Sequence, residues 1–188
     1  AFVDCNNDGW VDVFDGRLRV NNGDGTFTDT TDSSGIDSSG SATFGDYNND
    51  GAIDLFMATT SDQLYEGQGD CVFINVTAAS GIDDTQSFDT GDGPVDQQVP
   101  TVAASWVDLD GDGLLDLVQP NFGSFATEDY AIDRLWHNQG DGLFVDISES
   151  AGIVQGQGSG KAGRGSAPAD WDGDGDMDLY VSNYRLHR

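Results

Sequence analysis

The sequence predicts an all-β protein made of repeated four-stranded sheets. Three observations support this fold class. A nine-residue acidic loop recurs four times, and strand-like apolar residues follow it. A Gly-Asp turn recurs between two further strand-like runs, and in two of its three copies it reads Gly-Asp-Gly. The Asp-Gly pair in such a turn is the strongest short-range signal of a β-hairpin. Finally, no stretch of the chain shows a convincing helical period.

The acidic loop is clearest at residues 108–116, which read Asp-Leu-Asp-Gly-Asp-Gly-Leu-Leu-Asp. Carboxylates at positions 1, 3, 5 and 9 of one loop repel each other, and a hard cation with oxygen ligands removes that cost. Ca²⁺ takes 6–8 oxygens at about 2.3–2.6 Å. The start resembles an EF-hand loop, but the closing acid stands at position 9 and strand-like Leu117 and Val118 follow. We therefore predict a calcium loop between two strands.

The same spacing begins again at residues 4, 46 and 170. Four copies in one chain make an ordinary solvated turn a poor explanation. Position 3 is Asn in two copies and Asp in two, and either side chain offers an oxygen. Position 7 varies, as expected if its backbone carbonyl is the ligand. We expect up to four Ca²⁺ ions, held by Asp4, Asn6, Asp8, Trp10 and Asp12; Asp46, Asn48, Asp50, Ala52 and Asp54; Asp108, Asp110, Asp112, Leu114 and Asp116; and Asp170, Asp172, Asp174, Asp176 and Asp178.

The net charge limits the partners. Seven Lys and Arg against 34 Asp and Glu give a formal charge of −27, which makes nucleic acid and anionic membranes poor partners. Hydrophobic residues at 37% and aromatic residues at 10% argue against disorder. No apolar run is long enough to span a membrane. Because weak calcium loops need millimolar Ca²⁺, we expect an extracellular, cell-surface or periplasmic location.

A second motif follows each of the first three acidic loops, at residues 17–36, 63–82 and 134–153. It places Leu in a strand, then a Gly-Asp turn with Phe after it, then Gly-Ile. Each repeat therefore has four short strands, in the second repeat at 42–45, 54–59, 63–66 and 72–77. The acidic loop joins strands 1 and 2, and the Gly-Asp turn joins strands 3 and 4. We expect a single repeat array with repeats at 1–41, 42–102 and 103–165 and a partial repeat at 166–188.

The remaining connections vary in length. The interval from the end of an acidic loop to the hairpin Gly, which contains the connection between strands 2 and 3, varies from 11 to 24 residues. The interval from the Gly of Gly-Ile to the next acidic loop, which contains the connection after strand 4, varies from 11 to 27. In an up-and-down sheet these connections share the edge opposite the acidic loops. Binding sites often lie on variable loops held by a rigid scaffold. We therefore expect a ligand surface on residues 81–101, 121–133 and 154–167.

Four-stranded units at this period are typical of β-propeller blades. The acidic loop followed by Arg-Leu-aromatic, Gly-Asp-Gly-x-Phe and Ala-Gly-Ile resembles the FG-GAP/VCBS repeat family, particularly bacterial and cartilage-acidic-protein members associated with ASPIC/UnbV domains. The resemblance implies a propeller like that of integrin α-subunits, with Ca²⁺ in the loops. It also implies extracellular adhesion, protein interaction or carbohydrate binding, and some related propellers are enzymes.

About three and a half repeats are too few to close a ring of 4–8 blades. We favour a fragment of a larger propeller. The alternatives are a protomer completed by a neighbour and an open array that polymerises head to tail through its unpaired blade edges.

No catalytic constellation is recognisable, so we expect a binding or structural module that takes a protein or carbohydrate ligand. A lyase or dehydratase on a related propeller and a filament subunit are the alternatives. Cys5 and Cys71 could form a disulfide, stay free or link two molecules. Asn75 begins an N-glycosylation sequon, although an unmodified strand residue is the simpler interpretation. Lys161 and Arg164 form a basic spot in a variable loop, where a solvated loop is again the simpler interpretation.

Overall fold

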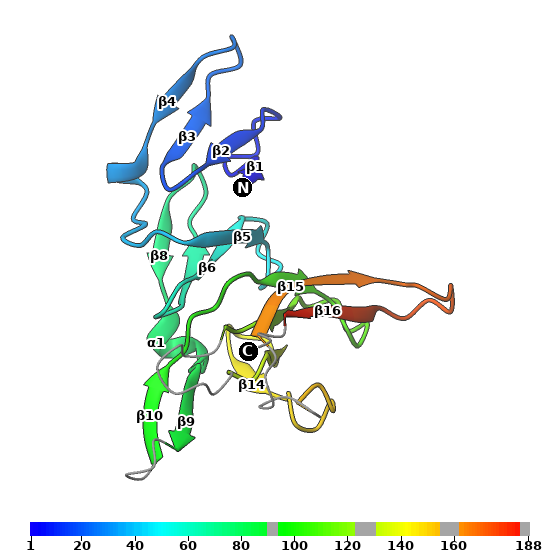
Figure 1. Ribbon diagram of the computed structural model, residues 1–188. Helices are drawn as coiled ribbons and strands as arrows, with labels where there is room; N and C mark the ends of the chain where they lie inside the picture. Colours follow the sequence, from blue (N-terminus) through cyan, green and yellow to red (C-terminus); the bar gives the residue numbers. More distant parts are fainter. Residues whose placement is uncertain (90–93, 123–130, 155–161, 185–188) are drawn as a thin grey trace.

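The computed structural model describes residues 1–89, 94–122, 131–154 and 162–184, which form antiparallel sheets (Figure 1). Three sheets have four strands in sequence order. We call them the first, second and third blades. The strands are β1 (Phe2–Val3), β2 (Asp12–Phe14), β3 (Leu18–Asn21) and β4 (Phe27–Asp29); β5 (Ser41–Gly45), β6 (Asp54–Ala58), β7 (Gln63–Gly67) and β8 (Phe73–Asn75); and β11 (Ser105–Val107), β12 (Asp116–Gln119), β13 (Arg134–Asn138) and β14 (Phe144–Asp146).

Two further sheets have two strands each. β15 (Ala162–Ala169) pairs with β16 (Asp178–Tyr184), and we call this pair the fourth blade. β9 (Thr85–Asp89) pairs with β10 (Pro94–Gln98). In Figure 1 this hairpin projects at the bottom, while β15 and β16 extend to the right. The prediction of an all-β fold with four-stranded blades is confirmed. The described residues form no closed ring.

Three details differ from the sequence expectation. β9 and β10 lie within 81–101, which we expected to be only a connection. β15 begins at Ala162, before the expected repeat boundary at 166, with an irregular register between Gly163 and Gly165. Single helical turns follow strand 4, namely η1 (Thr31–Ser33) and α1 (Thr77–Ser80). One turn is too short to leave a helical period in the sequence.

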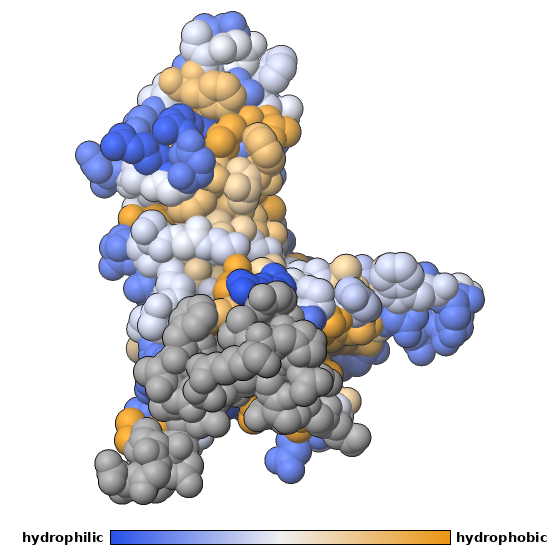
Figure 2. All heavy atoms as spheres, viewed as in Figure 1, coloured by the Kyte–Doolittle hydropathy of each residue, from blue (hydrophilic) through white to orange (hydrophobic). Residues whose placement is uncertain are grey.

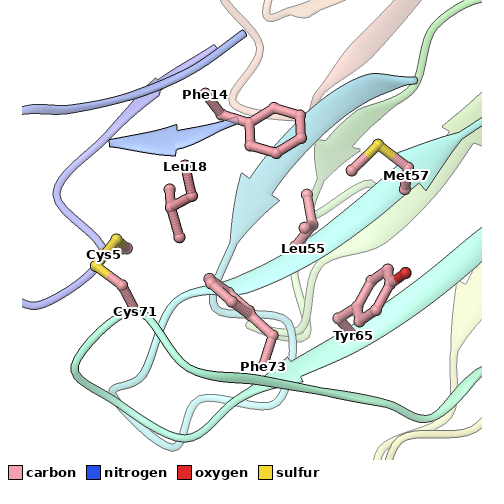
Figure 3. Close-up of a cluster of buried hydrophobic side chains, with 8 residues drawn as sticks. All are labelled: Cys5, Phe14, Leu18, Leu55, Met57, Tyr65, Cys71 and Phe73. Carbon is pink, nitrogen blue, oxygen red and sulfur yellow. A yellow bond between two sulfur atoms is a disulfide. The ribbon is translucent and has the colours of Figure 1, made fainter. Parts of the chain in front are cut away.

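Apolar side chains fill the spaces between blades. The first cluster joins blades one and two (Figure 3) and consists of Cys5, Phe14, Leu18, Leu55, Met57, Tyr65, Cys71 and Phe73. The second includes Tyr47, Phe56, Ala58, Leu64, Leu117, Trp136 and Phe144, from blades two and three. Alternate residues of a strand face opposite sides. Every residue of β6 is therefore buried, because Leu55 and Met57 face the first blade while Phe56 and Ala58 face the third.

Successive copies of the second motif meet at the joint between blades. The Gly of Gly-Ile in one repeat lies against the strand-4 Phe of the next. Gly35 contacts the Phe73 carbonyl and Gly81 the Phe144 carbonyl, and both glycines have φ near +80°. The Phe73 N–H also donates to the Ser34 carbonyl at 2.7 Å. The fixed spacing inside this motif thus reflects a repeated inter-blade contact.

Among the described residues, no helix has the length and apolar character needed to cross a membrane.

Gly81→Ala should destabilise the protein. A left-handed φ costs an alanine about 1–2 kcal/mol, and the new Cβ would lie 2.7 Å from the Phe144 carbonyl oxygen. Overpacking of this kind adds about 1–3 kcal/mol. Gly69→Ala is the matched control, because Gly69 has φ +77° but no atom lies within 4 Å of the place that an alanine Cβ would take. Urea unfolding at fixed Ca²⁺ would measure both variants, and equal losses would contradict the inter-blade contact.

Candidate metal centres

The four acidic loops share one hydrogen-bonded shape. Each lies between the first and second strand of its blade. The position-1 carboxylate accepts a bond from the N–H of the position-6 glycine at 2.8–3.1 Å in all four loops. The position-5 carboxylate accepts one from the position-7 N–H at 2.7–3.0 Å. The position-6 glycines have φ between +88° and +98°, a region that L side chains avoid.

The position-9 aspartate ties the loop to the rest of the blade. In the second blade, Asp54 accepts bonds from the N–H of Tyr47 at 3.0 Å and of Gly67, on β7, at 2.8 Å. The same pair of bonds reaches Asp12 and Asp116. These three carboxylates are buried, with at most 2% of the residue exposed. The position-9 aspartate, at the start of strand 2, therefore connects the acidic loop with strand 3, a structural role that the sequence pattern did not reveal.

The fourth loop differs in one respect. Asp178 keeps the bond from the N–H of Trp171 at 3.0 Å, but it is exposed, and no third strand of this blade is present in the described part of the chain.

Burial makes the second acidic loop electrostatically costly. Burial raises the pKa of Asp54 to about 7. The N–H groups of Gly67 and Tyr47 oppose this shift, and the nearby carboxylates of Asp50 and Asp46 add to it. A cation beside the loop would favour the charged form of every acid in it.

The residues present fit a hard cation. Oxygens of Asp108, Asp110 and Asp112 lie within 4.8 Å of one another in the third loop. In the fourth loop the residues that come together are Asp170, Asp172 and Asp178, at positions 1, 3 and 9. In the first two loops, position 3 is an asparagine whose Oδ1 accepts the position-5 N–H at 3.0–3.2 Å. Oxygen-only donor sets of this kind suit Ca²⁺. Among the position-7 residues, Trp10 is exposed, and its indole offers only a donor, so a ligand role would fall to its backbone carbonyl.

Neighbouring loops contact one another directly. The side-chain amide of Asn7 donates to the Gly51 carbonyl at 3.2 Å, and that of Asn49 donates to the Gly113 carbonyl at 2.7 Å. Both asparagines stand at position 4 and have φ near +57°. In each case the acceptor is the position-6 glycine of the next loop. The first three loops therefore form a row along one edge of the array.

The structure settles the choice among the cysteine alternatives in favour of a disulfide. Cys5 and Cys71 are bonded, with Cα atoms 4.9 Å apart. The bond joins the first acidic loop to the turn between β7 and β8. A group formed by both sulfurs and Asp12 is therefore no metal site, since a disulfide sulfur is a poor ligand.

The variable connections meet in a group of polar residues that we call the polar cluster: the half-buried Asp62 and the buried Asp84, Thr101, Gln119 and Asn121. The Thr101 hydroxyl lies 2.5 Å from Asp62, 3.4 Å from Asp84 and 2.8 Å from the Asn121 side-chain oxygen. Gln119 donates to Asp62 at 2.7 Å. Gln119 and Asn121 are fully buried.

Two of the expected ligand segments are joined directly beside the polar cluster. Gln86 on β9 exchanges two hydrogen bonds with the backbone of Ile132, at 2.7 and 2.8 Å. The Gly163 N–H donates to the Asn121 carbonyl at 2.7 Å and brings in the third segment. Residues 90–93, 123–130 and 155–161 of these segments lie outside the described residues. Sequence reasoning missed Asp62 and Asp84, because neither belongs to a repeated motif.

Both acids of the polar cluster, Asp62 and Asp84, have pKa values above the usual range for a carboxyl group. Burial raises the pKa of Asp84 to about 7, with Gln86 and Arg134 opposing the shift and Asp62 adding to it. Burial also raises the pKa of Asp62 to about 6.

Two other sites expected from the sequence are the glycosylation sequon at Asn75 and the basic spot at Lys161 and Arg164. Asn75 is exposed on β8, and its side-chain oxygen accepts bonds from Thr77. The Arg164 guanidinium lies 4.5 Å from the centre of the Phe122 ring. Its expected neighbour Lys161 lies outside the described residues.

Asp84→Asn should change how stability depends on pH. The folded carboxyl has its pKa near 7 and the unfolded one near 3.9, so the folded state binds more protons between these values. The stabilisation from this proton is complete below pH 4 and is lost as the pH rises through about 7. As the pH rises from 4 to 8, the difference in unfolding free energy between wild type and Asp84→Asn should therefore shrink. The change is a few kcal/mol at most, at about 1.4 kcal/mol per pKa unit.

Urea unfolding of both proteins from pH 4 to pH 8 would measure this difference, with the exposed Asp96→Asn as the control. A stability difference that stays constant with pH would contradict the assignment to Asp84.

A comparison with protein families agrees with the repeat structure. A family model described as an FG-GAP-like repeat matches residues 4–57 and 108–181, which contain all four acidic loops. The matches cover more than half of the chain. No curated protein matches the sequence. The blades, the acidic loops and this match together show that the chain belongs to the FG-GAP-like repeat family.

Proposed function

We propose that this repeat module binds Ca²⁺ in its four acidic loops and that the ions stabilise the blades. The observation that carries the proposal is the shared shape of the loops, which brings acidic oxygens together in the third and fourth copies. Each ion would offset the repulsion within a loop whose position-9 acid is already held by backbone N–H groups. Asp or Asn side chains at positions 1, 3, 5 and 9 and the position-7 carbonyl would hold the ion.

We further propose an extracellular module that binds a protein or carbohydrate ligand through the side opposite the acidic loops. The disulfide supports an oxidising location, and millimolar Ca²⁺ is available there for loops of this kind. A binding role is favoured over catalysis, because Asp62 accepts hydrogen bonds from Thr101 and Gln119 and Asp84 accepts one from Gln86, so both carboxylates are already engaged.

Removing calcium should lower the thermal midpoint. A ligand that binds only the folded state stabilises it by roughly 2.7 kcal/mol at a hundred times its Kd. For a chain of this size that corresponds to about 5–10 °C per site. Differential scanning calorimetry in millimolar Ca²⁺, in EDTA and after calcium is restored would measure the shift. An unchanged midpoint in EDTA would contradict the calcium role.

Asp112→Asn sharpens this test. The asparagine keeps the oxygen that accepts the Leu114 N–H but removes a loop charge. Calorimetric titration should show weaker calcium binding at one site than in wild type. Asp32→Asn, at an exposed position outside the loops, should bind calcium as wild type does.

A second proposal concerns assembly, and it is favoured by the outer face of the first blade. Phe2 lies opposite Val13, as Phe44 lies opposite Leu55 and Trp106 opposite Leu117. Phe2 is nevertheless 77% exposed, and Figure 2 shows apolar atoms on the surface over the first blade. Phe27 is 46% exposed, whereas its counterparts Phe73 and Phe144 are 3% exposed. We propose that a further blade of the same type covers this face.

Sedimentation velocity over a concentration series would test whether a second copy supplies that blade. Wild type should associate as concentration rises. Phe27→Ser should weaken association, while Val95→Ser, an equally exposed change on β10, should not. A monomer at every concentration would exclude a second copy as the covering blade.

A further inference from the structure

The third acidic loop has a nitrogen ligand beside it. His137 lies on β13, and its Nδ1 is 3.1 Å from Asp116 Oδ1 and 3.7 Å from Asp110 Oδ2. One ligand atom from each of these three residues lies within 4.8 Å of the other two. Strand register places Val20 and Glu66 at the same position in the first and second blades. Neither residue offers a nitrogen, so the third loop differs chemically from those two.

The distances fit a small transition-metal ion. Bonds of about 2.1 Å place neighbouring ligand atoms about 3.0 Å apart in an octahedral site and about 3.4 Å apart in a tetrahedral one. The measured 3.1 and 3.7 Å lie close to this range. The His137 side chain is 22% exposed, that of Asp110 51% and that of Asp116 3%. The group is therefore anchored on its inner side and open to water on its outer side.

Ligand chemistry points the same way. Ca²⁺ and Mg²⁺ prefer oxygen ligands, whereas imidazole suits Zn²⁺, Cu²⁺ and Ni²⁺. Asp116 is positioned by the N–H groups of Leu109 and Asn138, and the Asn138 bond comes from the residue next to His137. The backbone thus fixes the carboxylate and the adjacent imidazole together. Two carboxylates and one imidazole, with water in the open positions, form a suitable set for such a cation.

We propose that Asp110, Asp116 and His137 bind a late first-row divalent cation such as Zn²⁺. The inference rests on the proposed function in one respect, that the acidic loops are metal sites. It differs in the ion, because it gives the third loop a preference for a transition metal over Ca²⁺. Val20 and Glu66 leave the first two loops as oxygen-only sites.

Isothermal titration of Zn²⁺ into the whole chain, in millimolar Ca²⁺ at neutral pH, tests the proposal. Wild type should bind one Zn²⁺ ion per chain with higher affinity than any further Zn²⁺ ions. His137→Gln should weaken that site at least about tenfold, because even supporting residues of metal sites cost 10–100-fold. His187→Gln is the control, since His187 is the only other histidine in the sequence. It should bind Zn²⁺ as wild type does.

A second measurement separates a metal ligand from a hydrogen-bond donor. If His137 only donates Nδ1–H to Asp116, Zn²⁺ should leave its ring ¹⁵N resonances unchanged and His137→Gln should keep wild-type Zn²⁺ affinity. Either result would overturn the proposal, as would the absence of a preferred Zn²⁺ site in wild type. A shift of the Nδ1 resonance with one equivalent of Zn²⁺ would support it.

Calcium titrations of the same proteins keep this test distinct from that of the proposed function. Loss of Zn²⁺ selectivity with intact calcium binding would overturn only the ion preference of the third loop. Absence of calcium binding with a retained Zn²⁺ site would overturn only the calcium role.

Discussion

The buried aspartate at the ninth loop position is the interaction on which each complete blade depends. Asp12, Asp54 and Asp116 each accept one backbone N–H from the loop and one from the third strand. A buried N–H that loses its partner costs about 1–3 kcal/mol, and removing this side chain would leave two of them. The same carboxylate carries a charge that burial disfavours. One residue therefore fixes the loop while its own charge is disfavoured by burial.

The joint between blades depends on a second local constraint. Gly35 and Gly81 let the chain turn with a left-handed φ while lying against a carbonyl of the next blade. The carbonyl is that of Phe73 or Phe144, the strand-4 phenylalanine in the next copy of the same repeated motif. Folding within a blade and packing between blades are thus specified by a few repeated residues. The Cys5–Cys71 bond adds a covalent link at the first joint.

The repeated features could be predicted from the sequence, and the unrepeated ones could not. Four acidic loops and three Gly-Asp turns place the strands of every complete blade. The β9–β10 hairpin was missed because its polar residues, such as Gln86 and Asp96, lack the apolar alternation of a half-buried strand. The start of β15 was missed because Gly163 and Gly165 carry no strand signal.

The candidate site residues could likewise be predicted where they belong to a repeated motif and not elsewhere. The acids that converge in the third and fourth loops were recognisable from their spacing. The polar cluster was not, because Asp62 and Asp84 are adjacent only in the folded chain, and burial is a tertiary property. Spacing alone could not pair Cys5 with Cys71, since the pairing depends on how two blades stack. His137 could not be recognised as a neighbour of the third loop, because it comes from a different strand than Asp110 and Asp116.

The complete burial of β6 has a consequence for how the array comes apart. Leu55 and Met57 close one apolar cluster and Phe56 and Ala58 close the next, so opening the second blade uncovers two clusters at once. Opening the first blade uncovers only one of them. Arrays with contacts between neighbours alone lose their ends before their middle. Local unfolding should therefore begin at the outer blades, and the second blade should keep its structure longer than the first.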